Sequence, residues 1–181
     1  NPNIEGADVL TNEIISEIQS LIEKAERPLI MAGHGIRLAG TSKRFGVLVD
    51  KLGIPVVSTW NALDLLPYNH PLYVGRPGVV ALRAPNFAVQ NCDLLISIGC
   101  RLDNIITAYN PQGFAREAKK IVIDIDQNEI DKLDMDISVS VACDAAEFIK
   151  AISEIVIPSH LDWKDWCFLC NDWKKRYAVN D

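Results

Sequence analysis

The sequence lacks the features that would direct it to nucleic acid or to a membrane. Its 181 residues include 18 Lys and Arg against 24 Asp and Glu, a net charge of −6. No block of basic residues interrupts this acidic balance, so nucleic acid and anionic membrane surfaces are not expected as partners. No apolar run approaches the roughly 18 residues that a membrane-spanning helix needs.

Cysteines are few and do not form a regular pattern. Five of them, an odd number at irregular spacing, predict reduced thiols and a cytoplasmic location, not a disulfide framework. Trp166-Cys167-Phe168-Leu169-Cys170 has the spacing of a redox pair, but it lies in a Trp-rich helical stretch and does not follow a strand. No second pair completes a zinc site. Redox and zinc chemistry are therefore not expected.

Clusters of reacting side chains are also missing. The sequence contains no Gly-x-Ser-x-Gly, Walker loop, His-Glu-x-x-His or paired-carboxylate site. No signal peptide is expected, and the sequence opens at Asn1-Pro2-Asn3 without Met. We therefore expect a fragment or processed piece of a larger enzyme, serving as a nucleotide-binding or scaffolding domain.

What the sequence does contain is an alternation of strands and helices. The strand segments are apolar throughout and do not alternate with polar residues, which is typical of a parallel sheet covered on both faces. The predicted strands are 28–32, 54–59, 94–98, 120–125 and 138–142. The predicted helices are 11–25, 41–52, 79–90, 127–132 and 144–156. Loops are expected over the Pro-rich residues 63–78 and over 103–113. With 49% hydrophobic residues for its core, the chain is predicted to form a doubly wound α/β fold.

A glycine-rich run ends the first predicted strand. Gly33-His34-Gly35 would let a phosphate approach the backbone, or would simply form a tight turn from strand to loop. Gly40 comes too late to complete a Gly-x-Gly-x-x-Gly dinucleotide fingerprint. His34 has no neighbouring nucleophile or metal partner in the sequence, so a structural or ligand-contacting role is expected and not a catalytic one.

Charged residues follow two other strands. Asp124 stands where a carboxylate could accept hydrogen bonds from ribose hydroxyls. Asp126 and Asp144 each precede a Glu by three residues, the spacing of a capping box, so helix capping competes there with ligand contact. Arg101 could pair with a phosphate or stack on a ring; the alternative is a salt bridge to Asp103 or to another loop acid.

The C-terminal segment has an aromatic stripe with alternating spacings of three and four residues. Such spacing places its members on one face of a helix, and this face needs a partner surface. The helix could fold back on this domain or pack on a domain outside the chain. The stripe comprises Trp163, Trp166, Cys170, Trp173 and Tyr177.

Taken together, these segments resemble the central domain of thiamine-diphosphate-dependent enzymes of the acetolactate synthase family. The similar residues occur in the family's order and span about residues 8–156. They are Arg27-Pro28 leading into Ala32-Gly33-His34-Gly35, then Gly53-Ile54-Pro55-Val56-Val57-Ser58-Thr59, Gly75-Arg76-Pro77-Gly78, Gly99-Cys100-Arg101-Leu102-Asp103, Ile123-Asp124-Ile125-Asp126 with Glu129-Ile130, and the Asp144 helix.

The resemblance implies a Rossmann-like domain, a mainly parallel six-stranded sheet with helices on both faces, inside a three-domain subunit. Residues 1–157 would be this central domain, and 158–181 an aromatic-rich helical linker to a missing C-terminal domain. Thiamine diphosphate and Mg²⁺ would be bound by flanking pyrimidine- and diphosphate-binding domains of the same polypeptide, in a homo-oligomer acting on a 2-oxo acid. The chain alone would be inactive.

The resemblance also implies a set of cofactor contacts, because the central domain of acetolactate synthases carries FAD in a structural role. Val80 and Ile105 depart from this pattern, since they stand where the family has polar side chains. Weak FAD binding or none is therefore expected. The contacts carried over by position are Gly33, His34, Gly35, Thr59, Gly78, Arg101, Asp103, Asp124, Ile125 and Asp144.

Two other functions compete with this interpretation. One is an independent NAD-dependent enzyme of sirtuin-like topology, which would need a catalytic His in a wet cleft and usually a four-Cys zinc module. The other is a non-enzymatic interaction domain that uses the aromatic tail.

Overall fold

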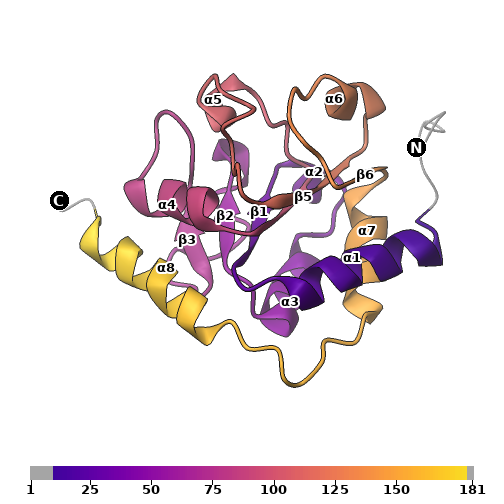
Figure 1. Ribbon diagram of the computed structural model, residues 1–181, viewed down its shortest axis with the longest axis horizontal. Coiled ribbons are helices and arrows are strands. Elements are labelled where there is room, and N and C mark those ends of the chain that lie inside the picture. Colours follow the sequence, from indigo (N-terminus) through magenta and orange to yellow (C-terminus); the bar gives the residue numbers. More distant parts are fainter. Residues whose placement is uncertain (1–9, 179–181) are drawn as a thin grey trace.

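A computed structural model describes residues 10–178, and its centre is one parallel sheet (Figure 1). Six strands lie in the order β3-β2-β1-β4-β5-β6, and every neighbouring pair is parallel. This is the strand order of a doubly wound dinucleotide-binding fold, so the predicted fold class is confirmed. The strands are β1 (Pro28–Ala32), β2 (Val56–Ser58), β3 (Tyr73–Gly75), β4 (Leu94–Ile98), β5 (Lys119–Asp124) and β6 (Val139–Ala142).

Helices cover both faces of this sheet. From β1 the chain runs outward in both directions, and right-handed crossovers then place α3 and α4 on opposite faces. Helix α3 packs against α7 and helix α4 against α8. The helices are α1 (Asn12–Lys24), α2 (Gly35–Leu38), α3 (Ser42–Leu52), the 3₁₀ turn η1 (Trp60–Ala62), α4 (Arg83–Asn91), α5 (Asn104–Thr107), α6 (Gln127–Asp131), α7 (Ala145–Glu154) and α8 (Lys164–Arg176).

Local sequence signals set the helix ends. Thr11 is the N-cap of α1, and its hydroxyl accepts a hydrogen bond from the Ile14 amide at 3.3 Å. Gly53 ends α3 in a left-handed conformation, φ +68°, which glycine adopts without steric cost. The central strands β1 and β4 are buried along their whole length, as their uninterrupted apolar sequences predict.

Four short elements were not predicted, among them the 3₁₀ turn η1 after β2. β3 lies inside the Pro-rich stretch 63–78 that was expected to be mostly loop, and α5 lies inside the expected loop 103–113. α2 begins directly at Gly35, where no helix was expected. Each of these elements has only three or four residues, too few for a hydrophobic period to be recognised.

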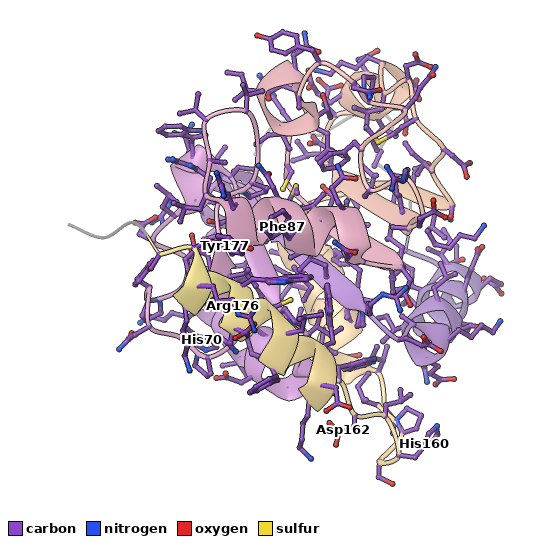
Figure 2. The ribbon with its side chains drawn as sticks, turned by 60° about the vertical axis from the view of Figure 1, so that its left-hand side comes forward. His70, Phe87, His160, Asp162, Arg176 and Tyr177 are labelled. Atoms are coloured by element: carbon purple, nitrogen blue, oxygen red, sulfur yellow. The ribbon has the colours of Figure 1, made fainter. Side chains whose placement is uncertain are left out.

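The C-terminal helix folds back on this domain. Indole Nε1 groups of Trp163 and Trp166 donate to the carbonyl oxygens of Ala25 and Pro28 at 2.8 and 2.9 Å. Figure 2 shows Tyr177 beside Phe87 of α4, with ring centroids 5.3 Å apart. The first of the two packing arrangements left open by the sequence is therefore the observed one. The linker role of residues 158–181 stays a prediction.

Within residues 10–178, every helix is too short or too polar to span a lipid bilayer.

Candidate functional site at the carboxyl edge of the sheet

The predicted contact residues all lie where strands of the sheet end. Because the strands are parallel, these ends meet at one edge, called here the carboxyl edge, where α5 and α6 also lie (Figure 1). Ligands of doubly wound folds bind at this edge, next to the point where the strand order reverses. In this sheet the reversal lies between β1 and β4.

Gly33 and Gly35 meet the backbone of Gly99 at that reversal point. The Gly33 amide donates to Ile98 and the Gly35 amide to Gly99, at 2.9 and 3.1 Å. A Cβ added to Gly33 would lie 1.9 Å from the Gly99 carbonyl oxygen. The glycines therefore permit two loops to touch, and these two amides are already used within the protein. This geometry matches the tight-turn alternative for Gly33-His34-Gly35.

His34 connects this turn to the end of β2. Its Nδ1 lies 2.8 Å from the carbonyl oxygen of Asn61, so Nδ1 carries the proton and donates. The Thr59 amide donates to Ala32 at 3.0 Å. Both contacts join the ends of β1 and β2, and neither brings a nucleophile or a second histidine to the edge.

Gly78 lies after β3 and is held from two sides. Asn86 of α4 accepts from the Gly78 amide at 2.8 Å and donates to its carbonyl at 3.0 Å. At φ +125° the residue has a conformation that side chains rarely adopt, and a Cβ would lie 2.7 Å from the Ile105 carbonyl oxygen. Gly78 thus lets the segment after β3 approach α5 closely.

Asp124 ends β5 and is almost fully buried, with 8% of its surface exposed. Burial raises the pKa of its carboxyl group, opposed by hydrogen bonds from the amides of Asp126 and Ile125. Arg101 contributes a smaller favourable charge and pairs with Glu129 at 3.6 Å. Arg101 therefore forms a salt bridge, but its partner Glu129 belongs to α6 and is neither Asp103 nor another loop acid. Ile125 is exposed beside them.

Other carboxylates at this edge cap helices. Asp103 accepts from the Ile105 and Ile106 amides, both at 3.0 Å, and begins α5. Asp126 accepts from the Asn128 amide, and Asp144 accepts from the Ala146 amide at 2.7 Å. The capping predicted for Asp126 and Asp144 is confirmed, and less of their hydrogen-bonding capacity remains for a ligand.

The contact between Arg76 and Trp60 was not predicted from the sequence. The Arg76 guanidinium carbon lies 3.4 Å from the centroid of the Trp60 ring. The Nε atom of Arg76 is buried and has no hydrogen-bond partner. The sequence does show that Arg76 stands between Gly75 and Pro77, directly after β3. Placing Trp60 beside it also requires knowing that β2 pairs with β3.

Residues 10–178 were also compared with the requirements of a metal site and of a reactive thiol. No group of three or more His, Cys, Asp or Glu in this part of the chain could hold a metal ion. Burial raises the pKa of Cys100 to about 12 and of Cys167 to about 11, which disfavours the reactive thiolates. A groove of about 570 Å³ lies away from the carboxyl edge, between the segment before β1 and the start of α8, with Trp163 and Trp166 in its lining.

One family model and several relatives match this chain. Residues 15–152 match a family model described as "Thiamine pyrophosphate enzyme, central domain". A probable acetolactate synthase large subunit of Methanocaldococcus jannaschii is 42% identical over 118 residues, 65% of this chain and 20% of that protein. The acetolactate synthase of Mycobacterium avium is 34% identical over 169 residues, 92% of this chain and 27% of that protein. The acetolactate synthase large subunit of Lactococcus lactis is 34% identical over 132 residues, 73% of this chain and 23% of that protein.

Proposed function

Because the chain belongs to the family of thiamine pyrophosphate enzyme central domains, we propose that it is the non-catalytic central domain of an acetolactate synthase-like enzyme acting on 2-oxo acids. The match to residues 15–152, which contain all six strands, carries this proposal. The chain spans 20% to 27% of the length of the three relatives described above. The chemical step therefore belongs to the remainder of such a polypeptide.

Thiamine diphosphate, when bound, would supply the nucleophilic carbon chemistry of such an enzyme. The residues of this chain do not fit the Mg²⁺ that accompanies the diphosphate, since residues 10–178 lack a group of metal-binding side chains. We assign both groups to flanking pyrimidine- and diphosphate-binding domains, in a homo-oligomer of the full-length protein. The lack of a disulfide-like cysteine pattern supports a cytoplasmic location.

We further propose that the carboxyl edge is a ligand-binding face with fewer free hydrogen-bonding groups than the carried-over FAD contacts imply. The amides of Gly33 and Gly35 and the carboxylates of Asp103 and Asp144 already have partners within the protein. The exposed side chains Val79, Val80 and Ile105 make part of this face apolar. These observations support weak FAD binding or none.

The test compares the 181-residue chain with the full-length polypeptide that contains it. Each is supplied with pyruvate, thiamine diphosphate and Mg²⁺, and acetolactate and carbon dioxide are measured. We expect product only from the full-length protein. Turnover by the chain alone, in material free of the host's own enzyme, contradicts the non-catalytic assignment. A full-length protein inactive toward every 2-oxo acid tested contradicts the proposed reaction class.

The family match favours this function over the two alternatives. A sirtuin-like enzyme would use NAD to remove acyl groups, so an NAD-dependent deacylation assay of the chain separates that alternative from ours. A pure interaction domain would leave the full-length protein without 2-oxo acid turnover.

A further inference from the structure

We propose that Arg76, held against Trp60, binds an anionic oxygen group, phosphate or carboxylate, of a ligand at the carboxyl edge. This inference deepens the ligand-binding role proposed above for the same edge and rests on it. It assigns the binding to a residue pair that none of the carried-over contacts includes.

The fold brings the two residues together. β2 and β3 are neighbouring parallel strands, with Val57 opposite Gly75. Trp60 begins η1 just after β2, and Arg76 directly follows β3. The ring and the guanidinium therefore leave the same edge side by side, and they stack at 3.4 Å. Stacking fixes the plane of the guanidinium and leaves its N–H edges to make in-plane hydrogen bonds.

One of these N–H groups lacks a partner. The Nε–H group of Arg76 is buried within the protein and donates to no acceptor there. Buried polar groups in folded proteins are nearly always paired, so an unpaired donor needs a specific explanation. A bound oxygen anion accepting from the guanidinium would supply the missing acceptor.

The charge of Arg76 is also uncompensated. Two other arginines at this edge have acids beside them: Arg37 pairs with Asp64, and Arg101 pairs with Glu129. Among the ion pairs of residues 10–178, Arg76 has none. Its charge acts instead on the Tyr73 hydroxyl, where it partly opposes the rise in pKa caused by burial.

The surroundings strengthen an interaction with an anion. Val79 and Val80 follow Arg76 in the chain, and Val79 donates to the Ile105 carbonyl at 2.9 Å. These three side chains are exposed and apolar. A ligand seated on them would displace water from the neighbourhood of the guanidinium, and the attraction between opposite charges rises as the local dielectric constant falls. The fitting ligand therefore has an anionic group next to an apolar body.

The test follows the Nε–H of Arg76 directly. Uniformly ¹⁵N-labelled chain is titrated with inorganic pyrophosphate and, separately, with pyruvate, and the Arg76 signal is assigned by its loss in Arg76→Met. We expect a saturable shift of this signal with at least one probe. Pyrophosphate as the effective probe identifies a phosphate ligand; pyruvate identifies a carboxylate.

Calorimetry with the effective probe then compares matched variants. Arg76→Met should weaken binding at least tenfold, Arg76→Lys less, and the ion-paired control Arg37→Met by less than twofold. An unchanged affinity in Arg76→Met, or an Nε–H signal that neither probe moves at millimolar concentration, overturns the assignment. If Arg76→Met does not fold, the Arg76 Nε–H signal is assigned by its loss in Arg76→Lys. The titration of the wild-type chain then decides by itself whether the anion binds.

This outcome is separable from that of the proposed function. Turnover of a 2-oxo acid by the full-length protein, with an immobile Arg76 signal, overturns only the anion site. A saturable shift in the chain, with no turnover by the full-length protein, overturns only the proposed reaction.

Discussion

The substitution Gly33→Ala should destabilise the protein more than its single added methyl group suggests. The new Cβ would lie 1.9 Å from the Gly99 carbonyl oxygen, whereas real Cβ contacts essentially never fall below 3.0 Å. The obstacle is backbone, which cannot rotate away as a side chain can. The two loops must therefore separate by about 1 Å, the difference between those two distances.

The cost has two parts. Overpacking in a close-packed region costs about 1–3 kcal/mol. Separation also strains the hydrogen bonds from Gly33 to Ile98 and from Gly35 to Gly99, each worth about 0.5–1.5 kcal/mol. We expect a loss of about 2–6 kcal/mol, a large share of a typical stability of about 5–15 kcal/mol.

Urea unfolding of the 181-residue chain measures this loss. With a slope of about 2 kcal/mol/M, the midpoint should fall by about 1–3 M. The matched control is Gly46→Ala inside α3, where an added Cβ meets no atom within 4 Å. That variant should gain about 0.5–1 kcal/mol because alanine favours the helix. A Gly33→Ala midpoint equal to that of wild type would refute the close approach of the two loops.

Three further predictions concern caps, the C-terminal helix and pH. Asp144→Ala removes the acceptor for the Ala146 amide and should cost about 1 kcal/mol, seen as a lower melting temperature; an unchanged melting temperature would rule out a stabilising cap. Trp166→Phe removes the buried hydrogen bond to Pro28 and should lower the free energy of unfolding in urea by about 1–2 kcal/mol. The control Phe168→Ala changes a side chain that is 73% exposed and should alter it by less than about 0.5 kcal/mol. Equal losses in the two variants would argue against the docked helix. Burial raises the pKa of Asp124 from 3.8, so the folded state holds its proton more tightly, and stability should fall as pH rises from 3.8 to the raised value. Asp124→Asn should abolish this part of the pH dependence, and identical profiles for the two proteins would contradict it.

The sequence predicted those parts of the fold that local patterns determine. β1 and β4 were recognised because buried parallel strands are apolar at every position. The caps at Asp126 and Asp144 were recognised because capping depends only on residues within one turn. β3 was missed because it is three residues long and lies between prolines, and its strand state depends on pairing with β2.

The candidate site was predictable as a set of strand ends and not as a set of contacts. Gly33 and Asp124 could be assigned to the carboxyl edge because each stands at the end of an apolar predicted strand, whereas Thr59 came only from the family resemblance. The stacking of Arg76 on Trp60 could not, because it requires the register of β2 and β3. The aromatic stripe predicted that α8 is covered, but hydrophobic spacing does not identify the covering surface.

The way α8 is attached has a mechanical consequence. The helix lies beyond the matched residues 15–152. The indole of Trp163, just before the helix, donates to the carbonyl oxygen of Ala25, and the indole of Trp166 within it donates to that of Pro28, the first residue of β1. Near its other end Lys174 bonds to the carbonyl oxygen of Tyr73 in β3. A force applied to the C-terminal end of α8 therefore reaches the sheet through two anchor points on different strands, β1 and β3. This pair of anchors resists rotation of the helix as well as its extraction, so α8 would move with the sheet as one body.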